Sequence, residues 1–327
     1  MPASGYGTQG GTGNETEESG VSASGGTKAI IAALLANAGI ALAKFVGYLV
    51  TGSSSMLAEA VHSVADTSNQ GLLLLGGKRA QRVATAEHPF GYGRDRYFYS
   101  FVVALLLFSL GSVFALYEGI HKLESEEPLT SPLVAVIILV VAIGLEGFSF
   151  RTAIAESRPL KGRLSWWGFI RQSKSPELPV VLLEDFGALI GLVLALLGVG
   201  LTVLTGNPVF DALGTIAIGV LLGVIAVILI IEMKSLLIGE GASAPVLRRI
   251  VGAIEEGGLV QRVIHIRTQY LGPEELLVAA KIALQPCTTI EDVARGIDAA
   301  EQRVRSAVPE ARLIYLEPDL DRSAVRG

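Results

Sequence analysis

Three ionisable residues lie inside residues 55–75, an apolar stretch that is long enough to cross a membrane. They are Glu59, His62 and Asp66, and the last two are four residues apart. On a helix, that spacing places the imidazole and the carboxylate on one face, one turn apart. The two side chains would be half of a tetrahedral site for a divalent metal ion. The alternative is a structural pair that hydrogen-bonds to a neighbouring helix.

A second acidic pair, Glu184 and Asp185, lies in another apolar stretch. Ionisable groups at membrane depth are costly and face a protein interior or a cavity. Together with His62 and Asp66, the pair would supply one nitrogen and up to three carboxylates, a set that suits Zn²⁺ and also accepts Mn²⁺, Fe²⁺ or Co²⁺. Neighbouring residues point about 100° apart around a helix, so both acids need not face one cavity. The alternative is that one carboxylate pairs with a basic side chain and neither binds a metal ion.

The composition limits the class of protein. Hydrophobic residues make up 50% of the chain and occur in long runs, which is typical of a membrane protein. The formal net charge of −5 does not favour nucleic-acid binding. Cys287 is the only cysteine, which excludes an intrachain disulfide framework and a thiolate cluster. With four histidines in the chain, a metal site must be rich in carboxylates.

The elements that must position these residues are membrane helices. The sequence predicts an α-helical membrane protein with a C-terminal α+β domain: a disordered tail over 1–27, a six-helix transmembrane domain over 28–236, a cytosolic domain over 241–320 and a tail over 321–327. The six expected helices are Lys28–Val50, Ser55–Gly76, Tyr97–Ile120, Pro132–Ile154, Pro179–Leu204 and Pro208–Ile231.

Basic residues predict the orientation of the chain. The connections after the second and fourth expected helices are rich in Arg and Lys, whereas the opposite loops offer only Lys122 beside several glutamates. The positive-inside rule therefore places both termini in the cytosol. Trp166 and Trp167 lie among basic residues in the connection after the fourth helix, which indicates an anchor at the lipid headgroups.

The segment after Ala242 has the composition of a soluble domain. Alternating strands over 260–270 and 274–284 follow a helix over 245–256, and a second helix and a closing strand come after them. Thr288 and Glu291 predict a capping box at the second helix. The order αββαβ predicts a small sheet with helices on one face. Neither a phosphate-cradling glycine motif nor a nucleophile elbow occurs, so we expect no enzyme and no cofactor.

These features resemble the cation diffusion facilitator family of divalent metal transporters. The resemblance covers roughly residues 28–319 and includes the histidine and aspartate four apart, the acids of the fifth helix and the αββαβ domain, which in that family is ferredoxin-like. Its most specific match is His88-Pro89-Phe90-Gly91-Tyr92-Gly93-Arg94-Asp95-Arg96-Tyr97, similar to the family signature between the second and third helices. The acidic pair and the Gly206-Asn207-Pro208 turn before Asp211 resemble the branch that contains the mitochondrial proton-coupled zinc antiporter of animals.

The resemblance implies a homodimer in a lipid bilayer that exchanges a divalent metal ion, most often Zn²⁺, for protons. The family site has two ligands on the second helix and two on the fifth, each pair four residues apart. His62 and Asp66 match the first pair, but Val181 lies four before Asp185 and Ala188 four after Glu184. Both acids are therefore candidates. Asp185 is favoured because it matches the family's aspartate, with Glu184 completing the coordination or accepting a proton.

The family's secondary metal sites are reduced in this chain. His88 remains in the connection after the second helix, but Tyr92 replaces a further histidine. His265 lies where a cytosolic ligand occurs in the family, and Lys281, Tyr315 and Glu317 stand near the other ligand positions, which leaves too few donors for a closed site. We expect export across the plasma membrane. The alternatives are a transporter of Mn²⁺, Fe²⁺ or Co²⁺, and a membrane metal sensor or scaffold that does not transport.

Overall fold

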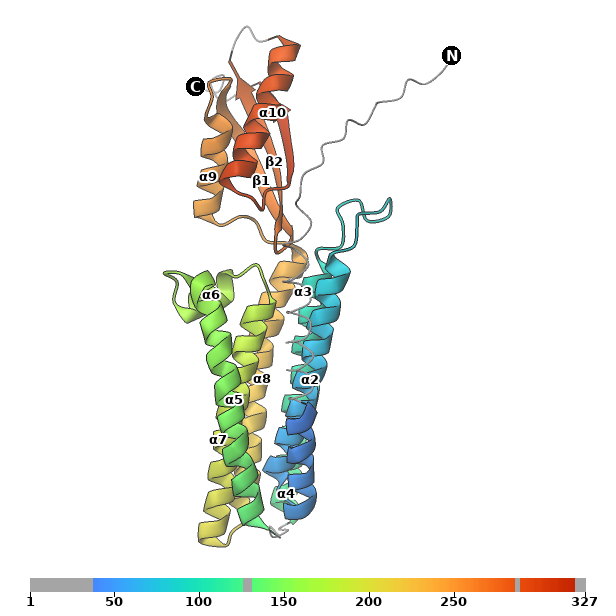
Figure 1. The fold of residues 1–327 in the computed structure, drawn as a ribbon, viewed down its shortest axis with the longest axis vertical. Coiled ribbons are helices and arrows are strands. Elements are labelled where there is room, and N and C mark those ends of the chain that lie inside the picture. The colour runs from blue at the N-terminus through green and yellow to red at the C-terminus, as the bar shows by residue number, and fades with distance from the viewer. Residues whose placement is uncertain (1–37, 126–130, 286–288, 321–327) are drawn as a thin grey trace, which may run out of the picture.

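Long helices form a bundle, and a small domain with a sheet lies at one end of it (Figure 1). A computed structural model describes residues 38–125, 131–285 and 289–320. It confirms the predicted class, an α-helical membrane protein with a C-terminal α+β domain. The expected tails at 1–27 and 321–327 lie outside the described residues.

The bundle contains helical segments at each of the expected membrane positions. They are a first helix described over Ala38–Thr51, α2 (Ser54–Ala80), a continuous run of α3 (Asp95–Leu106), the π-helix η1 (Leu107–Val113) and α4 (Phe114–Ser125), then α5 (Pro132–Lys161), α7 (Glu177–Thr205) and α8 (Val209–Ile238). By length and hydropathy, the run Asp95–Glu124 and the helices α5, α7 and α8 can each cross a membrane. Several helices extend beyond the expected boundaries by one or two turns. The last turn of α2 carries Lys78 and Arg79, which favour contact with water rather than lipid.

Asp211, near the start of α8, caps the start of α2. Its carboxylate accepts hydrogen bonds from the backbone N–H of Ser54 and from the hydroxyls of Ser53 and Ser54, at 2.9–3.1 Å. Its own N–H donates to Oγ1 of Thr202 on α7. All four side chains are buried, and a carboxylate at a helix N-terminus satisfies N–H groups that the helix leaves unpaired. The Asp211 cap, as we call this cluster, joins three helices at the end of the bundle farthest from the sheet.

The π-helix and the start of α4 pack closely on α8. The Ser112 hydroxyl of η1 donates to the carbonyl of Gly219, and a Cβ added to Gly219 would lie 2.8 Å from Cγ of Leu116 on α4. A residue larger than glycine would therefore push α4 and α8 apart. Small residues at such contacts let membrane helices approach each other.

The C-terminal domain consists of α9 (Ala244–Glu255), β1 (Val260–Gly272), β2 (Glu275–Leu284), α10 (Ile290–Ala307) and β3 (Leu313–Pro318). The strands are in the order β1-β2-β3, with β1 antiparallel and β3 parallel to β2. Buried residues of both helices and of the sheet form one core, as the predicted ferredoxin-like αββαβ order requires. Thr288 lies outside the described residues, and the capping box of α10 is formed one residue later, by Thr289 and Asp292.

The C-terminal domain contacts the same end of the bundle as both basic connections. Gly93, in the connection between α2 and α3, packs against the turn at Gly272, where a Cβ would lie 2.8 Å from the carbonyl oxygen of Leu271. Arg96 pairs with Glu177 at the start of α7, and its Nη1 is 4.0 Å from Glu274 of the β1–β2 turn. The short helix α6 (Trp166–Gln172), which carries the tryptophan pair, lies at this end too (Figure 1).

Candidate metal centre

One face of α2 is polar although it is buried in the bundle. Glu59, His62, Ser63, Asp66 and Asn69 are each less than a tenth exposed. With 3.6 residues per turn, their spacing of three or four places them in one stripe along the helix. This stripe is directed at the first helix and at α7, whose Lys44 and Glu184 side chains provide its partners. Buried ionisable groups in a membrane bundle indicate a functional site.

Several atoms of this stripe lack hydrogen-bond partners. Nδ1 of His62 lies 3.5 Å from Oδ1 of Asp66, but neither ring nitrogen of His62 makes a hydrogen bond within the described residues. The same is true of Oδ1 of Asp66 and Oδ1 of Asn69. Leaving a buried donor or acceptor unsatisfied costs about 1–3 kcal/mol, so four such atoms together need a ligand. A cation that accepts one nitrogen and carboxylate or amide oxygens fits this donor set.

Glu184 meets this stripe from α7. Nδ2 of Asn69 donates to Oε1 of Glu184 at 2.8 Å, and the carboxyl groups of Glu184 and Asp66 lie close enough to interact electrostatically. Two carboxylates repel each other unless a proton or a metal ion lies between them. The pair of acids on α2 and α7 is therefore able to hold either a proton or a cation.

Asp185 is directed to a different neighbour. Its Oδ2 accepts a hydrogen bond from the hydroxyl of Ser149 on α5 at 3.0 Å. This is the consequence of adjacent positions on one helix, which point about 100° apart. The structure therefore places His62 near Asp66 and Asp66 near Glu184, and it places Asp185 next to Ser149 at the interface of α7 and α5. Across the described ranges, no three His, Cys, Asp or Glu side chains converge closely enough to hold a metal ion.

Two polar residues of this region were missed by the sequence reasoning. Asn69 lies three residues after Asp66 and seven after His62, a spacing that places it on the same helical face and could have revealed it. Lys44 lies in the middle of the apolar first helix and is fully buried. Its presence there was a visible signal, because a lysine at membrane depth needs a partner.

The two secondary histidines stand apart from this region. His88 packs edge-on against the ring of Tyr92 in the connection between α2 and α3. His265 on β1 accepts a hydrogen bond from Arg267, and it lies opposite Lys281 in the sheet. Hydrogen bonds to Asp319 and Glu317 raise the pKa of Lys281 above its ordinary value, so the ammonium stays charged. A cation held by His265 would therefore meet a positive charge on the neighbouring strand.

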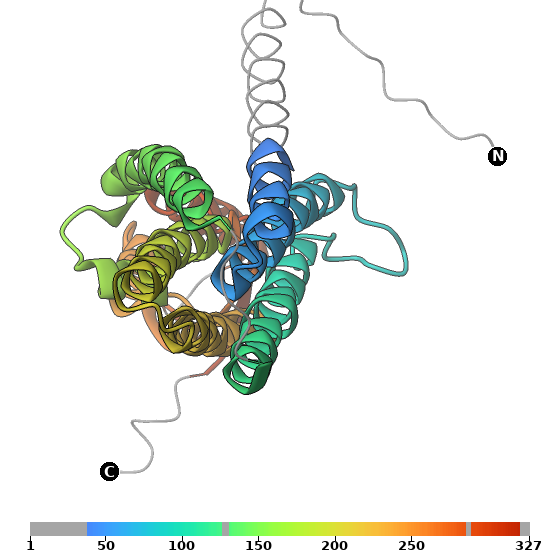
Figure 2. The ribbon, with the colours of Figure 1, turned by 90° about the horizontal axis from the view of Figure 1, so that it is seen from below.

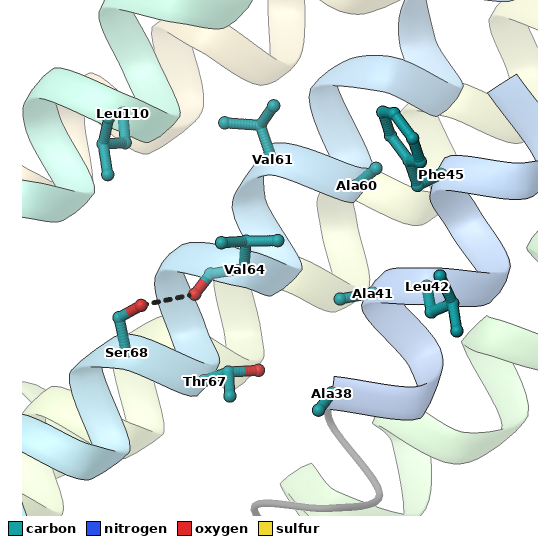
Figure 3. Close-up of a pocket in the computed structure, with 10 residues that line it drawn as sticks. All are labelled: Ala38, Ala41, Leu42, Phe45, Ala60, Val61, Val64, Thr67, Ser68 and Leu110. Carbon is teal, nitrogen blue, oxygen red and sulfur yellow. Dashed lines mark hydrogen bonds between the residues drawn. The ribbon is translucent and has the colours of Figure 1, made fainter. Parts of the chain in front are cut away.

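The opposite face of α2 lines an apolar groove (Figure 3). Its volume is about 600 Å³, and α2 contributes Ala60, Val61, Val64, Thr67 and Ser68. The first helix and η1 complete the walls, and the hydroxyl of Ser68 is bonded to its own helix. The groove offers no ligand for a metal ion. The two faces of α2 thus separate a polar interior from an apolar surface.

The bundle matches a known family over its full length. Residues 30–238 match the model of the cation efflux transmembrane domain. The chain belongs to the cation efflux family. This confirms the resemblance to the cation diffusion facilitators that the sequence indicated.

Relatives of this chain occur in animals and plants. The mitochondrial proton-coupled zinc antiporter SLC30A9 of Xenopus laevis is 35% identical over 258 residues, which are 78% of this chain and 46% of the antiporter. Metal tolerance protein C4 of Arabidopsis thaliana is 28% identical over 78% of this chain and 56% of that protein. The chain thus spans about half the length of these relatives. A solved C-terminal domain of MamM in a nickel form is 25% identical and covers 24% of this chain and 96% of that domain, with a TM-score of 0.23.

Proposed function

We propose that this cation efflux protein exports a divalent metal ion, Zn²⁺ in the first place, in exchange for protons. His62, Asp66 and Glu184 would bind the ion, with the amide oxygen of Asn69 next to them. Asp185 would act as a second acid at the edge of the site. The observation that carries the proposal is the set of buried, unpartnered atoms of His62, Asp66 and Asn69 beside Glu184. The name of the antiporter relative supports Zn²⁺ and protons as the exchanged ions.

Competition between protons and metal follows from the ligands themselves. A neutral imidazole and ionised carboxylates bind a metal ion, whereas their protonated forms do not. The contact between Asp66 and Glu184 supplies a place for a proton when the metal has left. Alternating exposure of this site to the two sides of the membrane would couple metal export to proton entry.

The orientation of the protein is part of the proposal. The chain is a multi-pass membrane protein, and its basic connections lie at the end that contacts the C-terminal domain. That end would face the cytosol, with both termini on that side. We place the protein in the plasma membrane as a homodimer, although the animal relatives are named as mitochondrial. Fractionation of the native host cell and cross-linking in the membrane test these two assignments.

Transport into inside-out vesicles tests the function. Zn²⁺ uptake driven by an imposed proton gradient should occur with the unaltered protein and be lost with His62→Ala or Asp66→Ala. His121→Ala is the matched control, because His121 lies on α4 and stacks on Tyr117, away from the stripe. Zn²⁺ binding without uptake would instead support the alternative function, a membrane metal sensor or scaffold.

A further inference from the structure

A buried lysine lies one turn from the proposed metal ligands. Lys44 of the first helix is 1% exposed at its side chain, and Nζ donates to Oγ of Ser63 at 2.7 Å and to Oε2 of Glu59 at 3.2 Å. It also lies 3.9 Å from Oε1 of Glu146 on α5. Its ammonium group thus sits among oxygen atoms from α2 and α5. Oxygen ligands of this kind, two carboxylates and a hydroxyl, are what a small cation requires.

Glu59 has the surroundings of a cation ligand rather than those of a surface charge. Its side chain is fully buried, and Oε1 has no hydrogen-bond partner among the residues that the structure describes. Gly191 of α7 makes room for this atom, since an added Cβ would lie 2.7 Å from it. A buried carboxylate with a free oxygen is costly unless a cation compensates it. Among the described residues, Lys44 is the basic side chain that pairs with Glu59, and the same ammonium also lies near the carboxylate of Glu146.

We propose that Glu59, Glu146 and Ser63 form a second cation site in the bundle, which is filled by the protein's own ammonium group on Lys44. This inference rests on the proposed transport site, because the tethered cation would limit the bundle to one exchangeable metal ion. One carboxylate of the pair is neutralised by the ammonium, so a second divalent ion finds too little negative charge and no space. The site is distinct from His62, Asp66 and Glu184, although it lies on the same stripe of α2.

Counting bound Zn²⁺ tests this proposal. The purified full chain in lipid nanodiscs is dialysed against a fixed free Zn²⁺ concentration, and the metal content is measured by mass spectrometry. We expect one ion per chain for the unaltered protein and for Lys44→Arg, which keeps the charge. Lys44→Ala removes the charge and opens the space, so it should bind two ions. Adding Glu59→Gln to Lys44→Ala should return the count to one.

A further pair of variants assigns the ions to their sites. His62→Ala alone should bind none, whereas His62→Ala combined with Lys44→Ala should bind one, held by Glu59 and Glu146. If Lys44→Ala binds one ion, or if its second ion survives Glu59→Gln, the proposal is wrong. Failure of the proposed metal site would look different, because the unaltered protein would then bind none, and failure of transport alone would appear only in the vesicle uptake and leave these ion counts unchanged.

Glu59→Gln supplies a second measurement in case Lys44→Ala does not fold. With Lys44 retained and its nearer carboxylate partner neutralised, the ammonium is balanced by Glu146 alone, and the charge beside the metal ligands becomes more positive by one unit. Zn²⁺ affinity at the transport site should then fall by about tenfold, and Lys44→Met combined with Glu59→Gln should restore it, because the charge balance is the same as in the natural pair. Unchanged affinity in Glu59→Gln would overturn the proposal.

Discussion

At the scale of the residue, the two adjacent acids of α7 have different surroundings. Glu184 contacts Asn69 and Asp66 of α2, and Asp185 accepts a hydrogen bond from Ser149 of α5. The resemblance to the family favoured Asp185 as the direct metal ligand, whereas the contacts with Asn69 and Asp66 favour Glu184. Substitutions can test which acid binds the ion, because the two side chains have different hydrogen-bond partners and different lengths.

Neutralising each acid separately should separate their roles. Glu184→Gln should reduce Zn²⁺ affinity by more than the roughly 10–100-fold that loss of an outer-shell partner costs, since it removes a negative ligand that faces Asp66. Asp185→Asn should cost about tenfold or less and keep transport. Zn²⁺ titrations and vesicle uptake across pH check both variants. If Asp185→Asn abolishes Zn²⁺ binding and uptake while Glu184→Gln retains both, Asp185 is the direct ligand.

How far the site could be predicted depends on whether its residues share one helix. His62 and Asp66 were found because a spacing of four fixes their relation whatever surrounds them. The choice between Glu184 and Asp185 depends on how α7 is rotated against α2, which is decided by tertiary packing such as that at Gly191. Lys44 is paired with Glu59 fifteen positions away, a relation between two helices that periodicity does not contain.

At the scale of the element, the start of α2 depends on a carboxylate from another helix. The Asp211 cap satisfies the Ser54 N–H and two serine hydroxyls in a buried region. The sequence placed Asp211 in a short turn motif but gave no sign of this contact, because the partners are more than 150 positions away. The helices themselves were predicted well, since long apolar runs determine them almost alone.

Removing the Asp211 cap should destabilise the bundle. Asp211→Ala leaves the Ser53 hydroxyl and the Ser54 N–H without their acceptor, while the Ser54 hydroxyl keeps Thr215 as a partner. Each unsatisfied buried donor costs about 1–3 kcal/mol, so the melting temperature in detergent should fall clearly. Asn207→Ala is the matched control: Asn207 accepts from the Val209 N–H in the same turn but is exposed, so its loss should change the melting temperature little. Equal melting temperatures for the two variants would contradict the capping role.

The capping box of α10 predicts a pH dependence in the C-terminal domain. Hydrogen bonds from Thr289 lower the pKa of Asp292 below its ordinary value of 3.8. The folded state therefore prefers the ionised form, and the stabilisation is present above that value and disappears as the pH falls through the lowered pKa. Hydrogen exchange of the first α10 amides in the full chain should accelerate there. Asp292→Asn should show faster exchange at neutral pH and no such step.

At the scale of the whole molecule, the basic connections and the position of the C-terminal domain indicate the same orientation in the membrane. The connection between α2 and α3 contacts the C-terminal domain through Gly93 and Gly272, and the connection between α5 and α7 contacts it through Lys174, whose ammonium group lies over the ring of Tyr270 on β1. Both connections are the basic ones of the chain. The positive-inside rule and the position of the domain therefore indicate the same cytosolic end.

Accessibility of single cysteines should confirm this orientation. Cys287→Ser first removes the natural thiol, and Asn207→Cys or Glu87→Cys then introduces one at an exposed position at either end of the bundle. An impermeant thiol reagent added to intact cells should label position 207 and should label position 87 only after permeabilisation. The reverse pattern would invert the orientation and the direction of transport.

Viewed along the bundle axis, the helices surround a common centre, and α7 borders on α5 and α8 (Figure 2). The Asp211 cap fastens the start of α2 to the start of α8 and to the end of α7, so these three helices are tied together at that end. In the proposed transport cycle, an outward opening would therefore displace α5 and the first helix from these three. His62, Asp66 and Glu184 would stay together on the tied helices, while Ser149 of α5 would move away from Asp185. The ligand set would remain intact when water enters from outside, so incoming protons, rather than the loss of a ligand, would release the metal ion there.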